Sequence, residues 1–358
     1  MADTLSPAPR REYIDSMKGL GILLVVFGHF MEPYRLGFLP IGATFLCIYW
    51  FHMALFCMCS GLVARFSPRK WLLQQVWLYA VGQVLMLVFR ALVLREDFAA
   101  TGGLWQALVL PWRHMWYLYA LLFWQLTAPL LAWVRDHAKW PGAIALFAAT
   151  VALGLWAGKI EWPLGLVRVL GFYPFYAFGV LFRPQIDAWA RAAERHLMVR
   201  LLPGLTALVL YGLYFYRCMQ SEVPLGESAR IFHDVPYFDG YAMQDRARFY
   251  LVGILTSLAL IAALGQCRTL RPLGRRTLPV YLLHMPILAF YTTLGFYEPG
   301  RTLPLPAVVV WFSLLSLGVI GFCSSGPMVW LFDQISSVWL RLTVWSPQRP
   351  IKTDPSRH

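Results

Sequence analysis

Long apolar runs follow one another along nearly the whole chain, separated by short polar connections. A helix needs about 20 mostly apolar residues to cross a hydrocarbon core of about 30 Å. Ten segments meet this requirement: 14–33, 41–64, 71–94, 114–134, 141–158, 164–182, 198–217, 248–266, 277–297 and 304–332. The runs are continuous and do not alternate, which favours helices over the strands of a β-barrel. The pattern predicts an all-α polytopic membrane protein with about ten transmembrane helices.

Composition supports this class. The 358 residues are 59% hydrophobic and 14% charged, whereas soluble domains carry about 25% charged residues. The net charge of +13 raises the possibility of nucleic-acid binding, but the basic residues lie in short connections between apolar runs. The expected partner is therefore the lipid bilayer, and no nucleic acid is expected. Neither a C-x-x-C pair nor an H-E-x-x-H motif occurs, so no metal site is predicted.

The distribution of Lys and Arg predicts the orientation in the membrane. Ten spans place both termini on one side, and the segments on that side carry about twice as many basic residues as the opposite connections. Both termini are therefore expected in the cytoplasm. The predicted organisation is a cytoplasmic segment at 1–13, a membrane domain at 14–335 and a disordered cytoplasmic tail at 336–358. The longest connection, at 218–247, is expected outside, where it either covers an acceptor site or is a plain excursion.

Three histidines lie near the middle of three predicted spans. His29, His52 and His284 fall at comparable depth, and polar groups in a membrane usually face a cavity or a partner. A single buried histidine is typical of packing, but three at one depth favour a shared polar cavity. Histidine is the usual general base for deprotonating an alcohol. The sequence thus indicates a candidate acid–base site within the membrane.

The first span carries further charged residues at informative spacings. Lys18 precedes His29 by eleven residues, or about 16 Å along a helix, so the two serve different depths of one pathway. Asp15 lies on the same face as Lys18 and can pair with it. Glu32 follows His29 by one turn. It either orients the imidazole or binds a hydroxylated acceptor, or it pairs with Arg35 at the membrane interface.

Other residues are assigned to a cavity or acceptor site. Arg168, inside a span, requires an anionic partner or a water-filled site. The aromatic residues around 112–124 form either an interfacial belt or a sugar-binding platform. The predicted cavity or acceptor residues are His52, Arg168, Trp116, Tyr117 and Tyr281.

Five blocks of the sequence carry a family resemblance. The first, "REYIDSMKGLGILLVVFGHF", resembles the first span of the acyltransferase 3 family of integral membrane acyltransferases, in which Asp, then Arg or Lys, then ten residues and His recur; Asp15, Lys18 and His29 fill those places. The later blocks resemble the family's in the same order: "YWFHMALFCMCSGLVAR", "HMWYLYALLFW", "GFYPFYAFGVLF" and "RTLPVYLLHMPIL". Within the family, the chain is most similar to the fucose-4-O-acetylase-like branch. Ala54 replaces a usual proline, and Lys18 replaces the commoner arginine.

The resemblance implies a function. The family transfers an acyl group from a cytosolic donor, usually acetyl-CoA, to a glycan, a lipid-linked sugar or another envelope component. In this chain His29 would act as general base or acyl relay, with Glu32 or His284 orienting it. The donor phosphates would lie near basic residues at the inner surface, together with Asp15: Lys18, Arg65, Arg69, Lys70, Arg275 and Arg276.

The resemblance also indicates a setting, and one alternative remains open. The expected location is the bacterial inner membrane, with polysaccharide-assembly proteins as further partners. The alternative from another class is a proton-coupled secondary transporter or flippase that uses the histidines as a proton relay.

Overall fold

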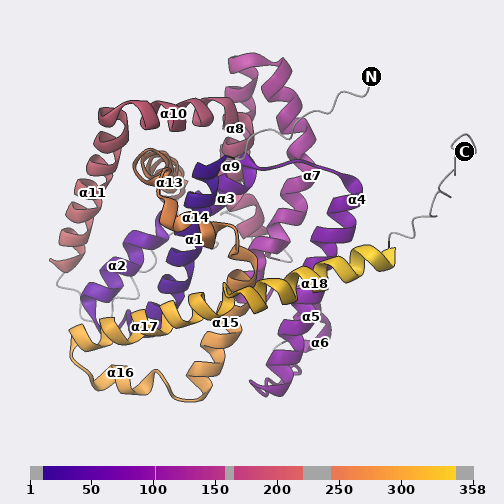
Figure 1. The fold of residues 1–358 in the computed structure, drawn as a ribbon, viewed down its shortest axis with the longest axis vertical. Helices are drawn as coiled ribbons and strands as arrows, with labels where there is room; N and C mark the ends of the chain where they lie inside the picture. Colours follow the sequence, from indigo (N-terminus) through magenta and orange to yellow (C-terminus); the bar gives the residue numbers. More distant parts are fainter. Residues whose placement is uncertain (1–10, 101, 158–164, 221–242, 344–358) are drawn as a thin grey trace, which may run out of the picture.

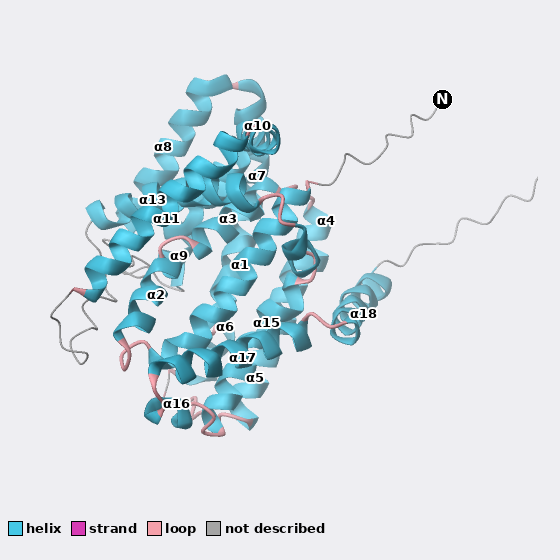
Figure 2. Cartoon of the chain, turned by 60° about the vertical axis from the view of Figure 1, so that its left-hand side comes forward, coloured by secondary structure: helices cyan, strands magenta, loops and turns pink. Residues whose placement is uncertain are grey.

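The computed structural model describes residues 11–100, 102–157, 165–220 and 243–343. Within these ranges all regular secondary structure is helical, and Figure 2 shows the helices gathered in one bundle. The first helices are α1 (Glu12–Met31), η1 (Glu32–Tyr34), α2 (Leu39–Tyr49), α3 (His52–Leu62), α4 (Pro68–Lys70), the π-helix η2 (Trp71–Val76), α5 (Trp77–Leu92), α6 (Gly103–Val109), η3 (Arg113–Met115), α7 (Trp116–His137) and α8 (Lys139–Ala157). The others are α9 (Leu166–Leu181), α10 (Arg183–Arg195), α11 (Leu197–Met219), α13 (Met243–Leu264), η5 (Arg268–Leu270), α14 (Arg271–Gly274), α15 (Thr277–Thr293), α16 (Glu298–Thr302), α17 (Leu305–Cys323) and α18 (Gly326–Thr343).

The described helices confirm an all-α polytopic membrane protein. In this part of the chain, 8 helical segments are long and apolar enough to cross a membrane. The pair α9 and α10, bent by 71°, counts as a ninth. The apolar helix α15 has 17 residues, which extend about 25 Å. Each of the ten predicted runs thus contains a helix, and the side on which the termini lie stays a prediction.

The second predicted span is not one continuous helix. α2 ends at Tyr49 and α3 begins at His52, because Phe51 leaves the helical region with φ −140° and ψ −24°. The His52 ring donates a hydrogen bond from Nδ1 to the Ile48 carbonyl oxygen at 2.9 Å, which closes the break. Hydropathy misses this break because the residues around it are apolar.

The tenth predicted span, 304–332, is also divided. α17 ends at Cys323, and the chain turns at Ser324, whose carbonyl oxygen accepts a hydrogen bond from Arg276 at 3.0 Å. α18 then runs to Thr343 at the edge of the bundle (Figure 2), so the predicted domain boundary at 335 falls inside a helix. Residues 344–358 of the predicted tail lie outside the described residues, as does most of the predicted 218–247 loop.

The helix α1 occupies the centre of the bundle (Figure 1). It packs against α2, α3, α13, α14, α15 and α17. Its apolar side chains Met17, Ile22, Val26 and Phe30 are fully buried. The helix that carries Lys18 and His29 is therefore surrounded by protein and not by lipid, which suits a functional span.

The helices α3 and α9 cross with their backbones in contact. A Cβ atom on Gly61 would lie 2.1 Å from the Tyr176 carbonyl oxygen, and one on Gly179 would lie 2.3 Å from that of Met58. Small residues permit such close approach between membrane helices. This contact fixes the helix that carries His52 against the helix that carries Arg168.

Candidate active site

The His29 ring lies in the last turn of α1, beside a carboxylate. Its Nδ1 lies 3.4 Å from Glu32 Oε2 and also 3.4 Å from the Tyr49 hydroxyl. A carboxylate can only accept a hydrogen bond, so this contact places the ring hydrogen on Nδ1 and leaves Nε2 with its lone pair. Glu32 also contacts Arg35 at 3.3 Å through its other oxygen. Glu32 therefore contacts both of the groups named as its partners, the His29 imidazole and the Arg35 guanidinium.

His284 lies directly beside His29, as comparable depth predicts. The two ring centroids are 5.4 Å apart, with the planes tilted by 33°. His284 is fully buried, and its Nδ1 lies 3.0 Å from the Val280 carbonyl oxygen and 2.7 Å from that of Tyr281. The ring stands alongside His29 without a hydrogen bond between them among those described, so Glu32 is the better placed of the two to orient His29.

A further histidine, His114 in η3, joins this cluster. It is 4% exposed, and its ring centroid lies 5.0 Å from that of His284. The Tyr281 hydroxyl donates a hydrogen bond to the His114 carbonyl oxygen. Sequence reasoning missed His114 because it is the first residue of the fourth apolar run, where an interfacial position is expected. The only signal available was a second ionisable residue next to Arg113 at the start of that run.

His52 and Tyr117 approach the cluster from α3 and α7. The ring centroids of His52 and Tyr49 are 4.6 Å apart, and the Tyr49 hydroxyl lies 3.4 Å from His29 Nδ1. Tyr49 therefore contacts both histidines. Tyr117 shares a short hydrogen bond with Ser60, and its ring lies 5.6 Å from that of Tyr281. The structure thus brings these predicted cavity residues around the histidine cluster.

The remaining predicted pair, Arg168 and Trp116, lies together. The Arg168 guanidinium stands 5.9 Å from the centroid of the Trp116 ring, and that ring packs against Phe172 at 4.8 Å. A cation over an aromatic face at this distance is a favourable contact. Arg168 also lies within electrostatic range of the Tyr49 hydroxyl. The pair therefore borders the region around His29.

The predicted donor-binding residues lie toward the other end of α1. Asp15 is buried and its Oδ2 lies 3.3 Å from Arg275 Nε. Asp15 thus forms an ion pair with Arg275, which lies between α14 and α15, and its expected pairing with Lys18 stays a prediction. Lys18 is half-buried, and it lies within electrostatic range of the Cys59 thiol of α3. About 16 Å of helix separates Lys18 from His29.

The other basic candidates surround the same end. Arg65, Arg69 and Lys70 are exposed on the segment after α3, and Arg65 lies near Arg183 of α10. Arg276 binds the turn between α17 and α18. Helix ends from widely separated parts of the sequence therefore form one basic face around the start of α1.

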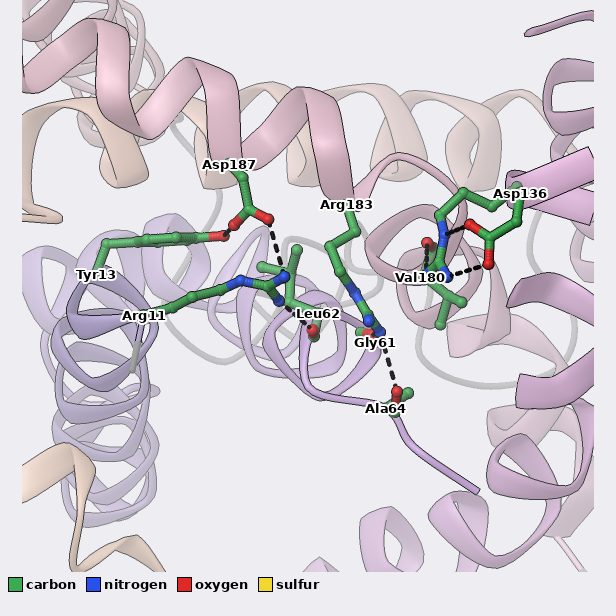
Figure 3. A network of polar contacts seen from close by, with 10 residues as sticks. Arg11, Tyr13, Gly61, Leu62, Ala64, Asp136, Val180, Arg183 and Asp187 are labelled. Carbon is green, nitrogen blue, oxygen red and sulfur yellow. Dashed lines mark hydrogen bonds and ion pairs between the residues drawn. The ribbon is translucent and has the colours of Figure 1, made fainter. Parts of the chain in front are cut away.

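Two further arginines at this face bind the end of α3, as Figure 3 shows. Arg11 donates to the Leu62 carbonyl oxygen at 3.1 Å, and Arg183 donates to the Gly61 and Ala64 carbonyl oxygens at 3.2 and 3.0 Å. The last carbonyls of a helix lack intrahelical donors, and cations favour that end. Asp187 joins the network by accepting from Arg11 at 3.0 Å (Figure 3). This arginine clamp holds α1, α3 and α10 together.

Neither a metal-binding group of described side chains nor the apolar groove beside α11 includes the histidines. Across the residues with assigned structure, no three His, Cys, Asp or Glu side chains are grouped to hold a metal ion. An apolar groove of about 700 Å³ lies between α11 and α13 and includes Trp50. Trp50 follows Tyr49, whose hydroxyl lies 3.4 Å from His29 Nδ1, so a residue of the groove wall is next in sequence to a neighbour of His29.

A bundle of apolar helices with a buried histidine cluster and a basic face at one end defines the class: an integral membrane protein with a candidate acid–base site. Residues 11–325 match the family model for an acyltransferase domain, that of acyltransferase 3. The chain belongs to this family, which confirms the family resemblance.

One curated relative is similar over part of the chain. The nodulation protein NolL of Sinorhizobium fredii (strain NBRC 101917 / NGR234) is 30% identical over 199 residues. The match covers 51% of this chain and 51% of the relative, so the chain spans about half the length of the protein it matches. No solved structure matches the chain.

Proposed function

We propose that this acyltransferase moves an acetyl group from cytosolic acetyl-CoA to a hydroxyl of a glycan or lipid-linked sugar. The expected product belongs to the cell envelope or exopolysaccharide, and the expected setting is the bacterial inner membrane, with polysaccharide-assembly proteins as partners. The observation that carries the proposal is the contact of the Glu32 carboxylate with His29 Nδ1. This contact gives an arrangement used in acyl transfer, in which a general base is held in position by a second polar group.

The chemical step follows from this arrangement. His29 Nε2 takes the proton of the acceptor hydroxyl as the oxygen attacks the thioester carbonyl. The new C–O bond forms, the C–S bond breaks, and the imidazolium returns the proton to the departing CoA thiolate. Glu32 stabilises the imidazolium while it exists, because its Oε2 lies 3.4 Å from Nδ1.

The basic face supports a phosphate-bearing donor. Lys18, Arg65 and Arg69 lie at the end of the bundle where α1 begins, and the phosphates of acetyl-CoA would bind there. About 16 Å of α1 then separates the phosphates from His29, a distance that the extended pantetheine arm can cover. Arg11 and Arg183 donate hydrogen bonds to carbonyl oxygens of α3. They would therefore add to the positive electrostatic potential at this face and would not bind the phosphates directly.

The test is acetyl transfer from labelled acetyl-CoA in isolated membranes. His29→Ala is expected to abolish ester formation while expression, membrane insertion and thermal stability match those of the wild type. His137→Ala, an exposed histidine at the far end of α7, serves as the matched control. Retained transfer in His29→Ala would refute the role of His29. Label that stays on the wild-type protein without acceptor would indicate a transient acyl-histidine and not direct transfer.

The same membranes separate the enzyme from the transporter alternative. The enzyme releases CoA in proportion to ester formed, whereas a proton-coupled transporter moves solute along a gradient without releasing CoA. Membership of an acyltransferase family favours the enzyme.

A further inference from the structure

The ring lone pairs of His284 and His114 have no described use in the mechanism. The two groups near His284 Nδ1 are carbonyl oxygens, which only accept hydrogen bonds, so Nδ1 carries the hydrogen. In a neutral ring, Nε2 then holds a lone pair. That atom is buried and has no hydrogen-bond partner among the described residues.

His114 adds a second buried acceptor. Its ring nitrogens are buried and lie outside hydrogen-bonding geometry for the described residues. A neutral imidazole always has one N–H and one lone-pair nitrogen. The Leu282 carbonyl, which Pro286 deprives of its usual helical donor, is an acceptor near the His114 ring and suits that N–H. The other nitrogen is left as an acceptor beside His284.

The three neighbouring imidazoles are thus poor in donors and rich in acceptors. His29 and His284 each direct Nδ1–H to an oxygen, and the three ring centroids follow one another at 5.4 and 5.0 Å. Buried acceptors without donors are costly, so the cluster is complementary to a ligand that supplies hydrogen-bond donors. A hydroxyl is such a donor, and one reacting hydroxyl can engage only one of these nitrogens.

We propose that His284 and His114 bind a second hydroxyl of the acceptor, next to the one that His29 deprotonates. The acceptor class is then a sugar with vicinal hydroxyls. This inference rests on the proposed acyl transfer, and it assigns recognition of the neighbouring hydroxyl to two residues that do no chemistry themselves. A site built to bind a hydroxyl discriminates strongly against analogues that lack it.

Two small alcohols test whether the site recognises a second, neighbouring hydroxyl. Membranes with labelled acetyl-CoA are supplied with 1,2-propanediol or with 1-propanol, which lacks the neighbouring hydroxyl, and ester formation is measured. The wild type is expected to prefer the diol in kcat/KM by about ten-fold or more. His284→Phe and His114→Phe are expected to bring that ratio close to one. His284→Gln, whose amide oxygen accepts a hydrogen bond, is expected to retain part of it, and His137→Phe is the control.

Each outcome decides the inference. Equal rates on the two alcohols in the wild type, including no turnover of either, overturn it, because a cluster that holds only a water molecule gives no preference for a diol. A full diol preference in both phenylalanine variants also overturns it. Loss of turnover on both alcohols in His29→Ala, with the ratio altered only in the His284 and His114 variants, supports both proposals. Turnover in His29→Ala contradicts the proposed function separately.

Discussion

The contact between Glu32 and His29 predicts the effect of Glu32→Gln on the rate. An imidazolium forms 3.4 Å from the carboxylate when His29 takes a proton. Hydrogen bonds to charged groups contribute about 1.5–3 kcal/mol net. The Glu32 side chain is 36% exposed and also forms an ion pair with Arg35 at 3.3 Å. Both features weaken its interaction with the imidazolium, so we expect a contribution at the low end of this range. A loss of about 1.5 kcal/mol corresponds to a fall of roughly ten-fold in rate.

The assay is the initial rate of acetyl transfer in membranes at saturating donor. Glu32→Gln is expected to lower kcat by roughly ten-fold with little change in KM for acetyl-CoA, because the lost interaction strengthens in the transition state. Arg35→Gln removes the competing cation and is the matched control, with kcat expected within about three-fold of the wild type. An unchanged kcat in Glu32→Gln beside an inactive His29→Ala would refute the reasoning. A raised KM with unchanged kcat would instead place Glu32 in substrate binding.

Four further predictions concern the framework, the Cys267 thiol and the orientation. Gly179→Ala places a Cβ 2.3 Å from the Met58 carbonyl oxygen and is expected to cost about 1–3 kcal/mol, lowering the thermal unfolding midpoint in detergent; an unchanged midpoint would contradict the close approach. Arg183→Gln removes donors from the end of α3 and is expected to cost about 1–3 kcal/mol in the same assay, with exposed Arg69→Gln as control. The Thr269 hydroxyl beside Cys267 lowers the pKa of that thiol, so more thiolate is present at neutral pH and Thr269→Ala should slow labelling by maleimide. An impermeant maleimide should label Cys267 in inverted vesicles and not in intact cells, and the reverse would overturn the predicted orientation.

Features within one helix were predictable from the sequence, and features of tertiary packing were less so. The separation of Lys18 and His29 follows from helical rise alone. The depth of His284, counted from the basic loop before its helix, predicted that it lies level with His29. The contact of Asp15 with Arg275 could not be predicted, because Arg275 lies 260 residues away in sequence. His114 was missed because hydropathy places the start of a run at the interface. Only the packing of η3 against α15 brings its ring to His284.

The glycine contact between α3 and α9 has a consequence for how large molecules enter. Backbones that touch at Gly61 and Gly179 form a rigid seam, so this side of the molecule cannot part without unpacking its core. α11, by contrast, presents mostly exposed apolar side chains and packs chiefly on α13, α2 and α10. Leu210 and Tyr211 of α11 line the apolar groove that includes Trp50, so displacement of α11 would widen that groove. The seam therefore leaves α11 as a helix that can move at lower cost than α3 or α9, and the acceptor that we propose would enter beside it.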